Sequence, residues 1–215
     1  MAIPVLIIGK SGSGKSTSLR NCVGHDFTVI KVLNKPFPFR GKIPSCTTDD
    51  YSTVLGCLKS KQAGRSIVID DAGYLITNQF MRGHSATGAG KQIFDFYNKI
   101  ADCFWSLVQF IVSSLPEDKV VYVIMHEDQD ENGNVKPKTI GKLLDEKVNV
   151  EGMFTIVLRC VSDGSQHKFI TQAADGAVSK SPIGMFDDVE IDNDLLEVDQ
   201  KIRAYYEIDK EEDKG

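Results

Sequence analysis

The chain has 215 residues, of which 41% are hydrophobic, and it carries a formal net charge of -5. This length and apolar fraction suit one large α/β domain, or one domain with a modest appendage, with ample material for a buried core. The charge argues against a generally basic protein that coats nucleic acid, although a local basic loop can still bind it.

The cysteines are odd in number and scattered, with no CxxC pair. Such a set indicates reduced thiols in a cytosol-like compartment and argues against a zinc site.

The N-terminal apolar run, residues 3–8, is too short to span a membrane and has no basic region before it. We therefore expect no targeting segment, no membrane partner and a cytoplasmic location.

The first predicted elements have the order strand, glycine-rich loop, helix. Residues 5–8 form a short continuous apolar run, which is the pattern of a strand covered on both faces in a parallel sheet. Residues 15–22 are predicted to form a helix, and residues 27–33 a second strand rich in β-branched side chains.

The next segment predicts a helix, a strand and a loop. Thr48 is placed to cap a helix whose first turn holds Asp49 and Asp50. Residues 67–69 then form a third strand. The polar, glycine-rich residues 82–91 predict a mobile loop of unusual length, and such loops are often functional.

A long helix follows this loop, because apolar residues recur at helical spacing over residues 93–111 until Pro116 ends the pattern. Residues 120–125 predict a fourth buried strand. The sequence then predicts a charged loop over residues 128–138. It also predicts a short helix within residues 140–150.

The C-terminal part predicts an antiparallel addition to the sheet. Residues 155–161 and 167–172 alternate like paired strands across a turn. A helix is expected at residues 194–206, followed by an acidic, disordered tail. We expect an ATPase domain at residues 1–190 and a C-terminal helix and tail at residues 191–215.

The loop after the first strand matches a phosphate-binding loop, or P-loop. Its residues are Gly9, Lys10, Ser11, Gly12, Ser13, Gly14, Lys15 and Ser16. The glycines let backbone N–H groups turn inward, Lys15 is placed to reach the β- and γ-phosphates, and Ser16 to hold Mg²⁺. Thr17 is placed to reach the α-phosphate, and the following helix adds its positive dipole end.

An acidic pair ends the third predicted strand. Asp70 is placed where a strand-end carboxylate meets the magnesium of a neighbouring P-loop. Asp71 is a candidate base or positioner for an attacking water. A helix N-cap is an equally good interpretation of Asp71.

His126 and Glu127 leave the fourth predicted strand at its carboxyl end, where ligands gather in open parallel sheets. His126 is a candidate sensor of the γ-phosphate, with a hydrogen-bonded structural role as the alternative. Glu127 is a rival to Asp71 as the catalytic base.

The loop at residues 82–91 carries cations among small residues. Cations bind phosphates, so Arg82 and Lys91 are candidate DNA-binding residues. The aromatic residues Phe96 and Tyr97 just beyond it fit the core-facing side of the long helix better than a base-stacking surface.

Other classes of P-loop protein fit less well. Residues 70–73 satisfy a DxxG pattern, but the NKxD element of GTPases lacks its aspartate at residues 34–37 and comes too early. No LSGGQ-like stretch of a transporter ATPase lies between the P-loop and Asp70. The scattered arginines do not form the lid that small-molecule kinases usually need.

On these residues, the chain resembles the RecA-like AAA ATPases of bacteriophages, also called phage nucleotide-binding proteins, some of which are single-strand annealing recombination proteins. The resemblance extends over most of residues 3–182. It is carried by the P-loop and by the segments at residues 48–51, 67–71, 121–127 and 139–143.

The resemblance implies an α/β fold with a RecA-like core, in which helices flank a mostly parallel central sheet. It also implies ATP and Mg²⁺ binding, homo-oligomerisation on single-stranded DNA, action beside a single-strand binding protein, and a bacterial host cytoplasm. No clear glutamate follows the second strand, where RecA-type enzymes place their base. We therefore expect hydrolysis to be slow or DNA-stimulated.

Two further functions stay open. The chain could be a nucleotide switch in which ATP orders the loop at residues 82–91 to recruit a protein, without DNA activity. It could also be a small-molecule phosphotransferase, which requires an acceptor that becomes phosphorylated.

Overall fold

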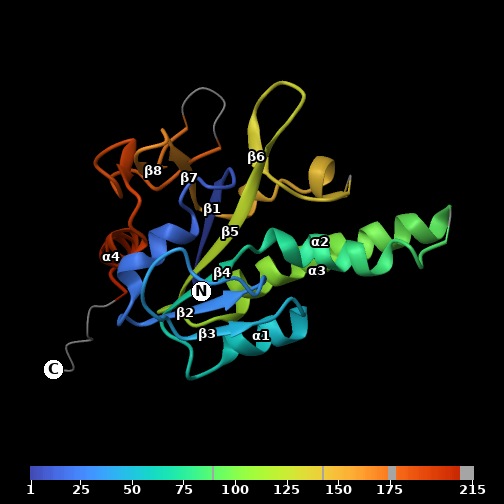
Figure 1. Ribbon diagram of the computed structural model, residues 1–215, viewed down its shortest axis with the longest axis horizontal. Helices are drawn as coiled ribbons and strands as arrows, with labels where there is room; N and C mark the ends of the chain where they lie inside the picture. The colour runs from blue at the N-terminus through green and yellow to red at the C-terminus, as the bar shows by residue number, and fades with distance from the viewer. Residues whose placement is uncertain (89, 142, 174–177, 209–215) are drawn as a thin grey trace.

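The computed structural model describes residues 1–88, 90–141, 143–173 and 178–208. Within these residues, nine strands form one sheet in the order β3-β2-β4-β5-β1-β7-β8-β9, with β6 paired to β5 (Figure 1). The strands are β1 (Ile3–Gly9), β2 (Phe27–Lys31), β3 (Ser45–Thr47), β4 (Ser66–Asp70), β5 (Val120–Gln129), β6 (Val135–Pro137), β7 (Ile156–Ser162), β8 (His167–Ile170) and β9 (Glu190–Asp192).

Neighbouring strands from β3 to β7 run parallel, whereas β6, β8 and β9 are added antiparallel. The helices are η1 (Ser16–Cys22), α1 (Tyr51–Lys59), α2 (Gly73–Gly83), α3 (Lys91–Ser114), η2 (Leu143–Lys147), η3 (Glu151–Met153) and α4 (Leu195–Tyr206). The prediction of an α/β fold with a mostly parallel sheet, flanking helices and antiparallel strands toward the C-terminus is confirmed.

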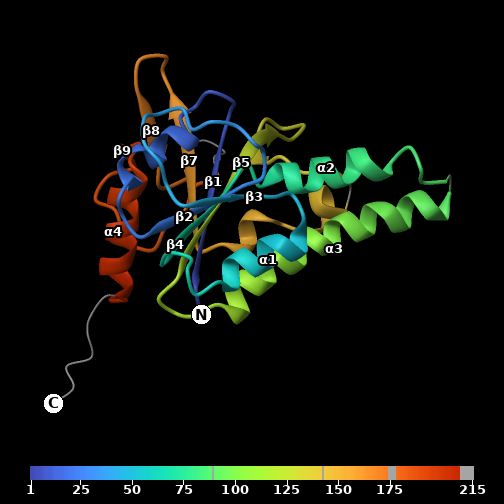
Figure 2. The same ribbon diagram turned by 60° about the horizontal axis from the view of Figure 1, so that its bottom comes forward.

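Strand β1 shows why the first apolar run is continuous. Leu6 and Ile8 pack into a core with α1, α2 and α3, whereas Val5 and Ile7 pack into a second core with η1 and α4. All four side chains are fully buried. Each contributes about 1.5–3 kcal/mol through burial, so β1 and the loop after it are held from both faces. Figure 2 shows α1 and α3 on the opposite side of the sheet from α4.

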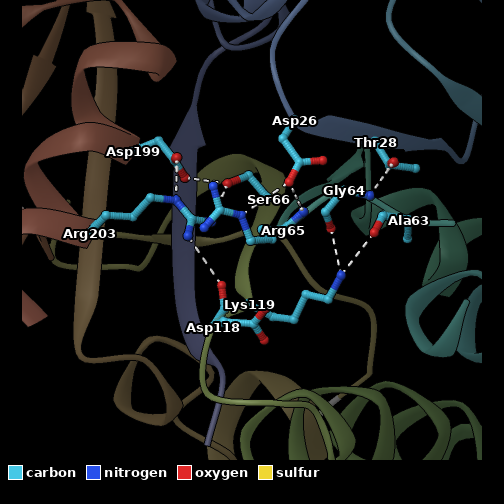
Figure 3. Close-up of polar contacts among 10 residues, drawn as sticks. All are labelled: Asp26, Thr28, Ala63, Gly64, Arg65, Ser66, Asp118, Lys119, Asp199 and Arg203. Carbon is cyan, nitrogen blue, oxygen red and sulfur yellow. Dashed lines mark hydrogen bonds and ion pairs between the residues drawn. The ribbon is translucent and has the colours of Figure 1, made fainter. Parts of the chain in front are cut away.

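A buried polar network fixes the helix α4 to the sheet, and Figure 3 shows most of its residues. Asp199 accepts hydrogen bonds from Ser66 Oγ at 2.6 Å, Tyr122 OH at 2.8 Å and Arg203 Nε at 2.8 Å. Arg203 also donates to Ser66 Oγ at 2.8 Å and to the carbonyl of Asp118 at 3.2 Å. Burial, reinforced by Asp199, raises the pKa of Tyr122. The network joins α4 to the amino ends of β4 and β5.

The helices α2 and α3 form an arm that extends away from the sheet in both views (Figures 1 and 2). The rings of Phe96 and Tyr97 on α3 lie 6.4 and 5.7 Å from Phe80 on α2. The predicted core-facing side of α3 is confirmed, since Phe104 and Val108 are fully buried.

The loop predicted at residues 82–91 is shorter than expected. Arg82 lies in the last turn of α2, which ends at Gly83, and Lys91 begins α3, so the connection is residues 84–90, of which residue 89 lies outside the described part. Helix α2 was not predicted from the sequence.

Two predicted helices are present but differ from the prediction in local detail. Residues 16–22 form a 3-10 helix of seven residues, because hydroxyl groups compete for the backbone, as Ser18 Oγ does by donating to the carbonyl of Lys15. The cap of α1 is Asp50, which accepts from the N–H of Thr53, whereas the predicted cap, Thr48, accepts through Oγ1 from the N–H of Asp50 before the helix begins.

Two segments after β5 also differ from the prediction. Residues 128–138 form a hairpin of β5 and β6, in which Asp130 accepts from the N–H groups of Asn132 and Asn134. The short helix expected within residues 140–150 is the π-helix η2.

The strands predicted near residues 155–172 are confirmed as β7 and β8, and the predicted C-terminal helix as α4. Glu207 ends α4 with a left-handed φ of 56°. The tail expected beyond it lies mostly outside the described residues, at 209–215. Among the helices that the structure describes, none has the length and apolar character needed to cross a membrane.

Candidate active site

The P-loop lies between β1 and η1, and two of its glycines are required by close contacts. A Cβ on Gly9 would lie 2.5 Å from the carbonyl oxygen of Cys160. Gly14 has a φ of 99°, and a Cβ there would meet the ring of His167 at 2.5 Å. Both positions therefore need glycine, because larger residues would push β7 or β8 away from the loop.

Lys15 points back into its own loop. Its Nζ donates hydrogen bonds to the carbonyls of Gly9 at 2.8 Å and Lys10 at 2.7 Å. Burial lowers the pKa of Lys15, and the electrostatic influence of nearby acidic groups, including Cys160, Asp71 and Asp70, offsets only part of this effect. A buried ammonium with neutral carbonyl partners gains energy when a negatively charged phosphate replaces them.

Ser16 and Asp70 meet at the carboxyl end of the sheet. Ser16 Oγ donates to Asp70 Oδ1 at 2.9 Å, although β5 separates β1 from β4. Asp70 is buried, and this burial, followed by the charge of Asp71, raises its pKa, while the Ser16 hydrogen bond opposes the rise. A hydroxyl and a carboxylate oxygen are hard ligands of the kind that Mg²⁺ prefers.

Asp71 turns the chain from β4 into α2 with a φ of 60°. This left-handed conformation costs a non-glycine residue about 1–2 kcal/mol and is tolerated best by Asp and Asn. Its carboxylate lies 2.6 Å from Lys35 Nζ and 3.6 Å from His126 Nε2. The N-cap position of α2 is Ala72, and no side chain caps the helix. The N-cap interpretation of Asp71 is therefore wrong.

His126 and Glu127 have different surroundings although they are adjacent. Burial and then the charge of Lys15 lower the pKa of His126, so its imidazole is neutral near pH 7. Glu127 accepts two hydrogen bonds from Arg159, at 2.8 and 2.9 Å, and its side chain is 3% exposed. Glu127 is thus paired with Arg159, whereas the other candidate base, Asp71, is paired with the more exposed Lys35.

A cavity of about 770 Å³ joins these groups. Its wall includes Lys15 and Thr17 from the P-loop side, Asp71 from β4 and α2, and Lys35 and Tyr74 from the opposite side. This volume lies in the range of small-molecule sites. The structure thus brings the predicted P-loop, acidic pair, His126 and Glu127 to one cavity.

No family model matches this chain. A search of curated proteins likewise finds no match. The functional interpretation of the cavity therefore depends on its residues and their geometry.

The predicted DNA-binding residues lie outside this cavity. Arg82 donates to Asp49 at 2.6 Å from the last turn of α2, and Asn78 donates to the same carboxylate at 2.8 Å. Lys91 begins α3 at the outer end of the arm (Figure 1). The structure does not bring these two residues to the P-loop.

The underside of the P-loop is supported by residues that the sequence analysis did not single out. Cys160 Sγ donates to the carbonyl of Ser13 at 2.9 Å and accepts from Asn193 Nδ2 at 3.1 Å. Burial raises the pKa of Cys160 to about 11, so it stays a thiol at neutral pH. No local signal marks Cys160, because its partners come from distant parts of the chain.

Lys35 is the second residue whose place was not predicted. In the sequence, Lys35 stands out only as part of an incomplete NKxD element. The signal that could have found it is its position just beyond the carboxyl end of β2, the strand next to β4.

No group of three or more His, Cys, Asp or Glu suited to a metal ion occurs among the residues that the structure describes.

Proposed function

We propose that the chain is a Mg²⁺-dependent ATPase with a RecA-like P-loop core, acting on single-stranded DNA in phage recombination or single-strand annealing. The observation that supports it most is the hydrogen bond between Ser16 Oγ and Asp70 Oδ1 beside Lys15. A hydroxyl, a carboxylate and an ammonium are the three groups that P-loop enzymes use for Mg²⁺ and the terminal phosphates.

Ser16 and Asp70 offer only two protein ligands, but two are enough for Mg²⁺. This ion usually keeps several waters and takes one or two carboxylates together with phosphate oxygens. Ser16 Oγ and Asp70 Oδ1 would supply the protein ligands in place of their mutual hydrogen bond. The bound ion would neutralise charge on the β- and γ-phosphates. Lys15 would exchange the carbonyls of Gly9 and Lys10 for phosphate oxygens.

Asp71 is the proposed general base. A water attacks the γ-phosphorus, the bond from this phosphorus to the β,γ-bridging oxygen breaks with its electron pair passing to ADP, and the proton of the water passes to Asp71. His126, neutral and 3.6 Å from Asp71, would orient the water or sense the γ-phosphate. Glu127 is the alternative base only if it leaves Arg159.

The DNA-dependent part of the proposal rests on the resemblance to phage RecA-like ATPases. It includes homo-oligomerisation on single-stranded DNA, a single-strand binding protein as partner, and a bacterial host cytoplasm. The charge of -5 places any DNA contact on a local surface rather than over the whole protein. Arg82 and Lys91 remain the proposed contacts.

Phosphate release measured with and without single-stranded DNA tests the proposal. We expect Mg²⁺-dependent release that DNA accelerates and that Asp71→Asn abolishes. Release that DNA does not change, together with no DNA binding, would remove the recombination role while leaving the ATPase. No release under any condition would remove the ATPase as well.

A nucleotide switch is the second candidate, and one observation favours it. The outer end of η1 is bonded to the start of α4, because Arg20 donates to the carbonyl of Asn193 and Asn21 to the carboxylate of Asp194. A shift of η1 on nucleotide binding would therefore be passed to α4. ATP-dependent protection of α4 amides from hydrogen exchange, without phosphate release, would support the switch over the ATPase.

A further inference from the structure

Lys35 lies beside the acidic pair on the side opposite the P-loop. It follows the carboxyl end of β2, and β2 and β1 lie on opposite sides of β4. The segment is tied in place, because the N–H of Val32 donates to the carbonyl of Asp70 at 3.2 Å and the N–H of Lys35 to the carbonyl of Leu33 at 2.8 Å. A backbone held in this way delivers the side chain to the same cavity as Lys15.

The ammonium of Lys35 is placed by two contacts. Its Nζ lies 2.6 Å from Asp71 Oδ2 and 6.0 Å from the centre of the Tyr74 ring. The hydrogen bond to Asp71 raises the pKa of Lys35, so the group stays charged. The side chain is 59% exposed, which leaves its ammonium free to move within the cavity. Lys31, which also borders the cavity, has its ammonium 4.8 Å from the centre of the Phe37 ring instead.

We infer that Lys35 is a phosphate-binding catalytic residue: with a nucleoside triphosphate bound, its ammonium moves from Asp71 to the γ-phosphoryl oxygens and stabilises their charge in the transition state. This inference rests on the proposed function. Lys15 and Lys35 would then contact the transferred group from opposite sides. The same move frees Asp71 Oδ2, so that the carboxylate accepts the proton of the attacking water while the electron pair leaves with ADP.

Lys35 belongs to the chain that holds the P-loop, so the cation that it supplies comes from the same chain. The competing explanation is that Lys35 only neutralises Asp71 and never contacts phosphate. The two explanations predict different affinities for a mimic of the γ-phosphoryl group when Lys35 is replaced in a protein whose residue 71 carries no charge.

The test compares the affinities of Mg²⁺-ADP with and without aluminium fluoride, which mimics the transferred group. We expect Lys35→Met to weaken the aluminium fluoride complex on the order of a hundredfold, as losing one charge-stabilising donor does, and to change Mg²⁺-ADP affinity by less than about twofold. Lys35→Arg should restore part of the loss. Lys59→Met is the matched control, since Lys59 Nζ also lies over a ring, that of Phe110, at 4.8 Å.

The same substitution is then made in an Asp71→Asn chain. If Lys35 contacts the γ-phosphoryl group, Lys35→Met still weakens the aluminium fluoride complex in this chain. If Lys35 only neutralises Asp71, Lys35→Met has no effect there, and that result would overturn the inference. Equal losses with and without aluminium fluoride would also overturn it. Wild-type protein that binds no Mg²⁺-ADP at all would instead overturn the proposed function on which the inference rests.

Mixing two inactive variants tests whether Lys35 acts within its own chain. Lys35→Met chains keep the P-loop, and Lys15→Ala chains keep Lys35. A mixture should recover no phosphate release. Recovery would show that Lys35 acts on the nucleotide of another chain and would contradict the assignment.

Discussion

The hydroxyl of Ser16 and the carboxylate of Asp70 lie 2.9 Å apart, although 54 residues separate them in the chain. The contact forms because η1 begins just beyond β1 and Asp70 ends β4, so both groups reach the carboxyl edge of the sheet. The carboxylate of Asp70 lies buried beside that of Asp71, and burial and then this neighbouring charge raise its pKa, although Lys35 and Lys15 offset part of the rise.

Asp70→Asn should therefore stabilise the nucleotide-free protein while removing its response to Mg²⁺. The substitution removes the cost of burying a charged carboxylate and, second, its repulsion with Asp71, which we expect to add about 1 kcal/mol to the stability and raise Tm by about 2–4 °C. The amide oxygen still accepts the hydrogen bond of Ser16. Thermal melting with and without Mg²⁺-ATP measures both effects, and a lower Tm in the free variant would contradict the repulsion.

Asp71→Asn should abolish hydrolysis and preserve nucleotide binding. Asparagine tolerates the left-handed φ of 60°, so the backbone stays in place while the proton acceptor is lost. We expect phosphate release to fall by about 10²–10⁴-fold, the usual contribution of a general base. Glu127→Gln is the comparison variant, and a larger loss there would transfer the role of base to Glu127.

Asp199→Asn should destabilise the protein strongly. It leaves the buried guanidinium of Arg203 without its carboxylate, which we expect to cost about 3–5 kcal/mol. Asp187→Asn is the control, because Asp187 pairs with Lys201 on the exposed surface and should contribute at most about 1 kcal/mol. Denaturant unfolding compares the two. Equal losses would show that the network in Figure 3 does not fix α4.

Arg82→Ala combined with Lys91→Ala should weaken binding of single-stranded DNA and reduce its salt dependence, because phosphate contacts release counterions. Fluorescence anisotropy at several salt concentrations measures both quantities. Lys59→Ala with Lys61→Ala removes the same number of charges elsewhere. If the two double variants bind DNA equally well, the arm is not the DNA-binding surface.

Local patterns predicted the features that neighbouring residues determine. The continuous apolar run of β1, the glycines after it and the helical spacing in α3 each depend on a few adjacent residues, and the structure has these elements where expected. Asp70 was predicted as a partner of the P-loop because parallel strands end at one edge of the sheet.

Features that depend on distant contacts could not be predicted in this way. The pairing of Glu127 with Arg159, and that of Lys35 with Asp71, requires the order of strands in the sheet. The cap of α1 was predicted at Thr48, and only the backbone geometry shows that Asp50 has this place. Helix α2 was missed because it follows the acidic pair without a capping side chain.

Isothermal titration with ATPγS, a slowly hydrolysed analogue, tests the central claim most directly. The wild-type chain should bind one analogue per P-loop in the presence of Mg²⁺. Lys15→Ala should weaken this binding by about 1.5–3 kcal/mol, since it removes charge-assisted hydrogen bonds to phosphate. Removal of Mg²⁺ with EDTA should weaken it as well. Equal affinity of the wild type and Lys15→Ala, or no binding by the wild type, would contradict the assignment of a nucleotide site.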